Sequence, residues 1–488
     1  MSQTLIQQFQ RTEGIIGLTL FETKDRRQVV FNSGQSTHLE EKLKGRYPLE
    51  PIHLTQLLSS KNGIFHAMAS VLAIEDYFKL KPTLIAGHIR QLMMQIATIH
   101  SHIHHFYWES LPNYLHRKHL EKVENKDLVY FPRLVDRDKD SGDLSIKTGG
   151  SILKHVAMAA ETLNVLQKTL AILGGKYPIV MNLIPGGVTN FKNEKDKLMI
   201  ILNKLERLKP FIEEVWPADV KQFTQDIPET TKVIFPNLNL ISFGSVPVEK
   251  IADQSTGLYI SGVLIDGKLE PLNDFKITES FDNTFYVPID EQGELNADLY
   301  DVNKKGAYTW IKSARYEGES MLTGPLARMM ITHFGGGNLE ISDSIGHMIN
   351  NLGLTSDSYN CVASRMFAEV FEARYHLKSI FHSLLAINQQ SDLNLKRPFD
   401  FSDGGTGTGR VEAPGGSLMH QTYIKGDQIM QYRIISPMNW NFSTRDKNNR
   451  SGIVEREMNH FFQENELSEF QANRVFTSYY PQALDGTQ

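Results

Sequence analysis

Cysteine is almost absent from this sequence, since Cys361 is the only one among its 488 residues. A single cysteine excludes an internal disulfide framework and any zinc or iron–sulfur site built from several cysteines of this chain. A nucleophilic role beside His376 is one alternative, but an unsupported cysteine in a helical pattern is more often a small core residue. The sequence therefore gives no positive indication of cysteine chemistry.

Strong charge and long apolar runs are also missing. The net charge of −5 is small for this length, so it favours neither nucleic-acid binding nor attraction to a membrane surface. No stretch reaches roughly 18 uninterrupted apolar residues, and the opening MSQTLIQQFQRTEG has no secretory pattern. We therefore expect no direct membrane insertion and a cytoplasmic location by default, or a periplasmic or membrane-associated one through a partner's signal.

The remaining composition is that of an ordinary globular protein, with 41% hydrophobic and 22% charged residues. The strongest helical pattern covers residues 83–108, where Ile85, Ile89, Leu92, Ile96 and Ile99 follow one another at spacings of three or four. The same spacing predicts helices over about 151–173, 194–216 and 357–385, the first of which is followed by two glycines. These helices predict a helical core.

Strand-like segments lie between and after the helices. GIIGLTLFE near the start, VVF at 29–31, GLYISGVLI at 257–265 and QIMQYRIIS at 428–436 are rich in β-branched and aromatic residues. Glycine clusters at 185–187, 335–337 and 403–410 indicate breaks between elements. The pattern favours one α+β body, in which small peripheral sheets surround a central bundle of long helices.

Other motifs give weaker indications. The histidines of HSHIHHFYW, at positions 100, 102, 104 and 105, permit a zinc site, but no carboxylate or cysteine completes a ligand set at metal-binding spacing. Hydrogen-bonded histidines on a buried helix are the favoured interpretation. DGGTGTGR lacks the strand and helix that flank a dinucleotide loop, and neither GxxxxGK[ST] nor GxSxG occurs. Nucleotide binding and serine hydrolysis are thus disfavoured.

Seven ordered blocks resemble the large subunit of nickel–iron hydrogenases. The blocks are RTEG (11–14), LEEKLKGRYP (39–48), HSHIHHFYWESLPNYL (100–115), LGGKYPIVMNLIPGGVTN (173–190), IKSARYEGESMLTGPLARM (311–329), EAPGGSLMHQ (412–421) and ISPMNWNFSTRD (435–446). The resemblance implies one domain over residues 1–488. It divides into an N-terminal sheet region at about 10–50, a helical core at about 51–220 and 355–390, and a region holding the remnant of a metal site at about 400–488.

In that family four cysteines, arranged as two C-x-x-C pairs, hold nickel and share two thiolates with iron. Alignment on His66 places Ser59 and Asn62 at the first pair. The second pair belongs to a closing motif DPC-x-x-C-x-x-H, which here becomes Tyr480, Pro481, Gln482 and Asp485, with Gln488 in place of the histidine. Thiolates are soft ligands that suit nickel and low-spin iron, whereas these replacements are weak or hard donors. The resemblance therefore implies that the nickel–iron centre is absent.

Other positions of the family site have changed or survived. Gly415 stands where the family has an arginine over the open metal position, and the family proline of K-x-P-R-Y is Ala314. Glu13 matches the glutamate that relays protons in the family. Glu40 matches a carboxylate that helps bind a structural magnesium-type cation, although the histidine that assists it has become Gln488. Magnesium at Glu40 is the single cofactor that the resemblance permits.

The hypothesis that follows is a non-catalytic homologue of the large subunit, which pairs with an iron–sulfur small-subunit-like protein in a redox or regulatory complex. Four alternatives stay open: a maturation or assembly accessory protein, a site rebuilt around a hard cation, a relative of the respiratory complex I subunit that descends from this family, and a nickel-dependent hydrogenase as global similarity alone implies. The EAPGG and PMNWN-x-x-RD blocks lie nearer to hydrogenases than to complex I.

Overall fold

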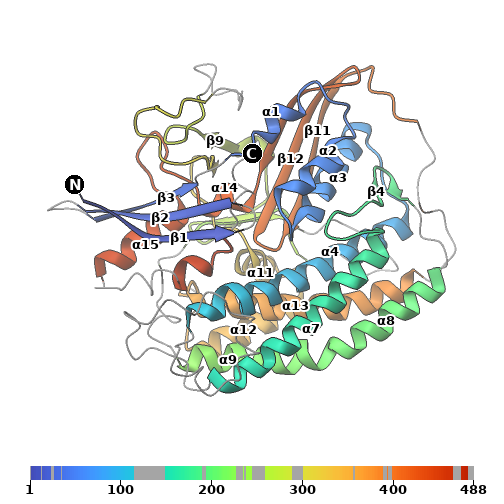
Figure 1. Ribbon diagram of the computed structural model, residues 1–488, viewed down its shortest axis with the longest axis horizontal. Helices are drawn as coiled ribbons and strands as arrows, with labels where there is room; N and C mark the ends of the chain where they lie inside the picture. The colour runs from blue at the N-terminus through green and yellow to red at the C-terminus, as the bar shows by residue number, and fades with distance from the viewer. Residues whose placement is uncertain are drawn as a thin grey trace.

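The computed structural model describes most of the chain. The described residues are 2–11, 14–22, 27–33, 36–114, 149–189, 194–226, 235, 238–244, 259–287, 300–355, 358–387, 393, 398–464 and 474–481. Figure 1 shows two regions, with long helices in the lower half and antiparallel strands above them. The predicted α+β class, with small sheets around a bundle of long helices, is confirmed.

The helical region is built around four long helices: α4 (Leu84–His104), α7 (Gly149–Gly174), α8 (Glu194–Pro210) and α13 (Val362–Ala386). Three shorter helices adjoin them: α9 (Trp216–Asp226), α11 (Pro325–Phe334) and α12 (Leu339–Leu352). The apolar stripe of α4 is buried, and Ile89, Ile96 and Ile103 are fully covered. Burial of this stripe against α13 and α7 stabilises the helix far more than local propensity does.

The sheets are small and antiparallel. The N-terminal sheet has the order β1 (Ser2–Arg11), β2 (Gly14–Glu22), β3 (Arg27–Ser33), and the C-terminal sheet the order β11 (Gly405–Ala413), β12 (Gly416–Lys425), β13 (Gln428–Ile435). A third sheet joins β6 (Leu240–Ser242), β7 (Gly262–Ile265) and β8 (Lys268–Glu270). Two-stranded pairs are formed by β4 (Leu183–Ile184) with β5 (Gly187–Val188) and by β9 (Ile277–Ser280) with β10 (Ser313–Tyr316).

Helix α3 (Gly63–Phe78) lies directly against strand β11, and glycine makes this contact possible. A Cβ atom added at Gly407 would come within 2.0 Å of the Ala73 carbonyl oxygen, and one at Gly409 within 1.9 Å of the Ala69 oxygen. The remaining helices are α1 (Leu39–Leu43), α2 (Pro51–Leu54), α14 (Pro437–Asn441) and α15 (Ile453–Glu464). The glycines of β11 thus let the middle of α3 pack closely on the C-terminal sheet.

Most predicted elements are confirmed, with four corrections. Helix 357–385 begins at Val362, because Cys361 caps it, and helix 194–216 extends through a π-helical segment, Phe211–Val215, into α9. Within 257–265 only Gly262–Ile265 is a strand. The glycine cluster at 403–410 is not simply a break, since β11 begins at Gly405 and uses its glycines to approach α3. Strand β1 was not predicted.

Candidate functional site

Ser59 and Asn62 occupy the turn that leads into α3. Ser59 follows the 3₁₀ turn Thr55–Leu58, and Asn62 precedes the first helical residue, Gly63. Both side chains are buried, and the Asn62 backbone N–H donates to Ser59 Oγ at 3.1 Å. The hydroxyl of Ser101 on α4 donates to Asn62 Oδ1 at 2.7 Å. Both predicted site residues therefore take part in a hydrogen-bonded turn that is fixed to α4.

The next residue of α4, His102, reaches the C-terminal segment. Its Nδ1 atom contacts the hydroxyl of Tyr480, and its Nε2 atom lies 2.6 Å from Glu372 Oε2 on α13. The tautomer with its hydrogen on Nε2 donates to the carboxylate and leaves Nδ1 as an acceptor for the tyrosine hydroxyl. Asn62 and Tyr480 are far apart in sequence, but they contact two consecutive residues of α4, Ser101 and His102.

Tyr480 is buried where the aligned family motif begins. Its ring stacks on His105 with centroids 3.7 Å apart, and its backbone is left-handed, with φ of 60°. Burial, with Glu369 and Glu109 nearby, raises the pKa of Tyr480 well above its usual value, so the hydroxyl stays protonated. A Cβ atom at Gly415 would lie 3.4 Å from the Tyr480 Cβ atom. The aromatic side chain therefore lies immediately beside the glycine that replaces the family arginine.

The segment that carries Tyr480 is held by α13 and by the π-helical segment His105–Ser110 that continues α4. The Nε2 atom of His105 donates to the Thr477 carbonyl oxygen at 2.8 Å, while its Nδ1 atom lies 3.0 Å from Glu369. Burial lowers the pKa of His105, but Glu369 and these hydrogen bonds outweigh it and raise the pKa overall. Arg365 donates to Ser478 Oγ at 3.0 Å and covers the ring of Tyr479. The segment 474–481 is therefore a docked part of the core.

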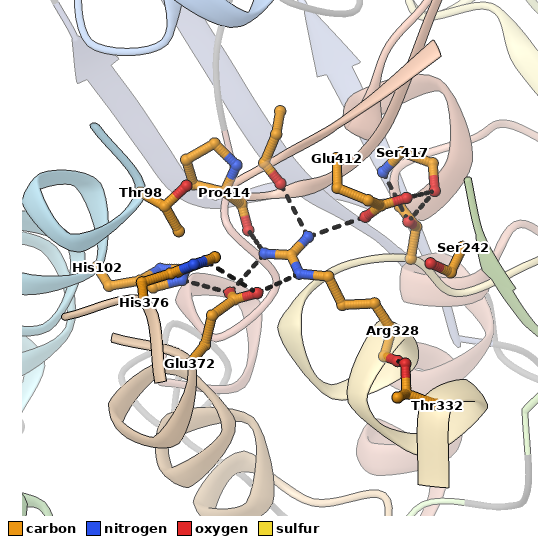
Figure 2. A network of polar contacts seen from close by, with 12 residues as sticks. Thr98, His102, Ser242, Arg328, Thr332, Glu372, His376, Glu412, Pro414 and Ser417 are labelled. Atoms are coloured by element: carbon orange, nitrogen blue, oxygen red, sulfur yellow. Dashed lines mark hydrogen bonds and ion pairs between the residues drawn. The ribbon is translucent and has the colours of Figure 1, made fainter. Parts of the chain in front are cut away.

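Arg328 organises a charged network beside this segment (Figure 2). Its guanidinium donates to both oxygens of Glu372 at 2.5 and 2.6 Å, to Glu412 at 2.9 Å, and to the carbonyl oxygens of Ala413 and Pro414 at 2.9 and 3.1 Å. A guanidinium has five N–H donors, so all of them are used. The network fixes the loop before Gly415 to α11 and α13.

The two carboxylates of this network differ in pKa. Burial alone would raise the pKa of Glu372, but Arg328 and the hydrogen bond from His102 hold it well below its usual range. Burial raises the pKa of Glu412 despite Arg328 and the Ser417 hydroxyl, which donates to it at 2.6 Å. Glu372 is therefore the firmly ionised partner of Arg328.

A second buried polar cluster links α3 to the C-terminal sheet. His66 Nδ1 lies 3.0 Å from His420 Nε2, and Ser70 Oγ and the Tyr432 hydroxyl lie 3.1 and 3.0 Å from His420 Nδ1. Burial, together with His66, lowers the pKa of His420 well below its usual value. A neutral His420 can accept one of these hydrogen bonds and donate another, so the cluster holds helix α3 against strands β12 and β13.

Glu40 lies in a different buried network. Its Oε1 atom accepts from the Lys312 ammonium at 2.7 Å and from the Ile434 backbone N–H at 2.5 Å. The same ammonium lies 3.4 Å from Glu279, which is also paired with Arg433 at 2.6 Å. A lysine cation thus adjoins the carboxylate where magnesium was expected, and the magnesium itself stays a prediction.

Several predicted residues lie outside the described part of the chain. These are Glu13, Gln482, Asp485 and Gln488. Of the predicted remnant pocket, the structure therefore describes Ser59, Asn62 and Gly415. A cavity of about 20 Å³, lined in part by Gly415, Glu369 and Tyr480, has room for about one water molecule.

The four neighbouring histidines make separate contacts. His102 and His105 contact carboxylates of α13, His104 lies 3.3 Å from Glu109, and His100 lies 3.0 Å from the Gln167 amide nitrogen. Burial lowers the pKa of His100 to about 3. In the described ranges no cluster of three or more histidine, cysteine, aspartate or glutamate side chains could hold a metal ion.

The comparison with known families identifies the chain. A family model described as nickel-dependent hydrogenase matches residues 38–126 and 144–482, which include the turn at Ser59 and Asn62 and the segment with Tyr480. The chain belongs to the nickel-dependent hydrogenase family. The resemblance seen in the sequence blocks is therefore confirmed.

Individual members of this family align over most of their length. The periplasmic [NiFeSe] hydrogenase large subunit of Desulfomicrobium baculatum is 27% identical, and the alignment covers 91% of this chain and 87% of that protein. The quinone-reactive Ni/Fe-hydrogenase large chain of Wolinella succinogenes is 25% identical, with 86% and 83% covered. The solved structure of the Ni-Fe-Se hydrogenase from D. vulgaris Hildenborough has a TM-score of 0.83 at 22% identity, with 100% of both chains covered. This last likeness concerns the fold.

Sequence reasoning missed the residues that organise this hydrogenase-family site. Arg328 was visible only as the penultimate residue of the block at 311–329, and Glu372 as one more residue of a predicted helix. A signal was nevertheless present, because a carboxylate inside an apolar helical pattern needs a buried cationic partner. None of the helices in the described residues combines the length and apolar composition needed to cross a bilayer.

Proposed function

We propose that this chain is a non-catalytic member of the hydrogenase large-subunit family, which supports a redox or regulatory complex without holding a nickel–iron centre. The observation that carries the proposal is the supply of thiols. The whole sequence contains one cysteine, and Cys361 is buried at the start of α13, where its sulfur accepts from the Ser364 N–H at 3.4 Å. A single thiol that caps a helix cannot supply the four thiolates that hold the metal centre in the family.

The donors at the family's first ligand pair do not fit nickel or a low-spin iron. Ser59 and Asn62 offer neutral oxygen and nitrogen atoms, and Ser59 Oγ and Asn62 Oδ1 already accept hydrogen bonds within the protein. Soft metals prefer thiolates, and a neutral hydroxyl or amide does not compensate their charge. Tyr480, which is stacked on His105, places a bulky aromatic ring two residues before the first position of the second pair. These features support a protein that retains the fold of the large subunit without its metal centre.

The proposed partner is an iron–sulfur protein like a hydrogenase small subunit. Support comes from the relatives, since those of D. baculatum and W. succinogenes are named a large subunit and a large chain, and the chain aligns with most of each. The complex would occupy the compartment to which the partner brings it. Two further candidates follow from the family: a nickel-dependent hydrogenase, as the relatives' names indicate, and an accessory protein of hydrogenase maturation.

Elemental analysis of the anaerobically purified full-length chain, with whatever protein co-purifies, tests the proposal. We expect no nickel and no infrared bands of metal-bound cyanide or carbon monoxide, with iron and acid-labile sulfide supplied by the partner alone. The D. baculatum [NiFeSe] hydrogenase, prepared in the same way, shows that the assays detect a complete centre. The same analysis measures magnesium, which tests the cation expected at Glu40.

The outcomes separate the candidate functions. Nickel together with diatomic bands would support a hydrogenase and refute the metal-free proposal. Iron with diatomic bands but no nickel, and maturation proteins in place of an iron–sulfur partner, would support the accessory role. If a metal is found, the double variant Ser59→Ala/Asn62→Ala locates it, because loss of that metal would place it at the turn before α3.

A further inference from the structure

A groove of about 750 Å³ runs along α13 from Phe367 to His382, between α9 and α12. In Figure 1 these helices lie at the bottom of the molecule, below the strands. The volume falls within the range of pockets that bind small molecules. Nothing in the site described above uses this groove.

One stripe of α13 forms much of the groove. Phe367, Phe371, Arg374, Lys378 and Phe381 line it and recur at spacings of four, three, four and three, which places them on one helical face. The stripe spans about 21 Å at 1.5 Å per residue. The groove is therefore elongated, with aromatic rings near both ends and two cations between them.

The floor of the groove is apolar. The rings of Phe367 and Phe371 lie 5.9 Å apart in a stacked arrangement, and both are only partly covered. Met329 of α11 and Ile341 of α12 also line the groove and are almost fully buried. An apolar chain laid along these side chains would cover aromatic surface that is now partly exposed to water.

The rim of the groove carries excess positive charge. Two of its cations have carboxylate partners: Lys378 lies 2.8 Å from Glu340, and Lys209 lies 4.0 Å from Glu213. Lys221 on α9 and Arg374 on α13 also line the groove and are exposed, and neither is within ion-pair distance of a carboxylate in the described residues. The residues that line the groove therefore include four cations and two carboxylates.

We propose that this groove binds an amphiphilic organic anion, with an apolar chain or ring system that carries one carboxylate or phosphate. The apolar part lies on Phe367 and Phe371, and the anionic group contacts Arg374 and Lys221. A guanidinium can bind either oxyanion through two parallel N–H donors, and a charge-assisted hydrogen bond is stronger than a neutral one. This binding site is independent of whether the family metal centre is present.

Fluorescence titration of the full-length chain with a dansyl-labelled undecanoic acid tests the proposal. We expect saturable binding to one site, and displacement of the probe by dodecanoate and by dodecyl phosphate. The neutral dodecanol should displace it at least about tenfold more weakly, a factor that corresponds to ~1.4 kcal/mol. Higher salt should weaken binding of the two anions and leave that of the alcohol unchanged.

Variants identify the groove as the site. Lys221→Gln with Arg374→Gln should weaken anion binding at least about tenfold, and Phe371→Ala should weaken the anions and the alcohol alike. Lys168→Gln is the matched control, because it removes an exposed lysine of α7 that does not line the groove. Circular dichroism of each variant checks that the helices are retained.

Three results of the titrations would overturn the proposal, and two further results would assign the groove to another kind of partner. The first is no saturable binding, and the second is equal binding of alcohol and anion. The third is an equal loss of binding in Lys168→Gln. Binding of the probe to the isolated chain but not to its complex would instead assign the groove to a protein partner, and would also refute a small-molecule site. Association with phosphatidylglycerol vesicles, without binding of the free anions, would assign it to a membrane surface.

Discussion

Replacing Glu372 by glutamine should strongly destabilise the fold. Glu372 is fully buried, accepts two hydrogen bonds from Arg328 and one from His102, and is held ionised by them. Glutamine keeps the shape but removes the charge, and its NH₂ group faces a donor of Arg328 or His102. Breaking one partner of a buried ion pair costs about 3–5 kcal/mol, because the remaining charge is left uncompensated. Glu412 still faces Arg328, so we expect the lower half of that range.

Urea denaturation of the purified chain measures this loss as a shift of the midpoint at constant slope. Glu319→Gln is the matched control, since Glu319 pairs with Arg450 at 2.8 Å on the surface, with both side chains more than 40% exposed. An exposed pair contributes about 0–1 kcal/mol. Equal effects of Glu372→Gln and Glu319→Gln would refute the reasoning.

A pH series tests the same carboxylate in another way. Because the pKa of Glu372 is depressed in the folded state, its contribution is fully present above the unfolded pKa of about 4.3. The contribution is lost as the pH falls below that value toward the folded pKa. The difference in stability between the wild-type chain and Glu372→Gln should therefore be constant near neutral pH and shrink in acid.

Three other predictions concern separate parts of the fold. Gly409→Ala should lower the free energy of unfolding by about 1–3 kcal/mol or more, because the added Cβ atom would lie 1.9 Å from a backbone oxygen of α3. Gly346→Ala is the counterpart, because a Cβ atom there would have no neighbour within 4 Å. It should stabilise α12 by about 0.5–1 kcal/mol in the same denaturation assay. Burial raises the pKa of Glu455 to about 7, so the contribution of Glu455 to the free energy of unfolding should fall as the pH rises from about 4.3 to 7. Glu455→Gln should remove this contribution to the pH dependence of the urea midpoint. A pH dependence that is the same in the variant and the wild-type chain would contradict the assignment. Tyr480→Phe should lower the free energy of unfolding by about 1–3 kcal/mol, since it leaves the buried Nδ1 atom of His102 without its partner. An unfolding free energy equal to that of the wild-type chain would show that this nitrogen finds another donor.

The sequence was informative where local pattern and family blocks agreed. Helices α4 and α7 match their predicted ranges closely, because an apolar stripe and a double glycine are local signals. Strand β1 was missed since its segment, SQTLIQQFQR, is rich in glutamine and becomes a strand by pairing with β2. Strand preference depends strongly on such pairing. Glycines 405, 407 and 409 predict a turn by composition, and only the position of α3 explains why they lie in a strand.

The candidate site was predictable in outline. Alignment with family motifs located Ser59, Asn62 and Gly415, and the structure links the first two to Tyr480 through neighbouring positions of α4. The charged network could not be predicted in the same way. Arg328 contacts Glu372 and Glu412 across 44 and 84 residues, and no local pattern in one sequence specifies such a pairing.

The single thiol of this chain also offers a built-in reporter of opening. Cys361 has no exposed surface and caps the first turn of α13, four residues before Arg365, which holds the C-terminal segment. A maleimide reagent can reach its sulfur only when that turn separates from the core. The labelling rate under native conditions therefore gives the free energy of opening at this junction. No engineered cysteine is needed, and no second thiol complicates the signal.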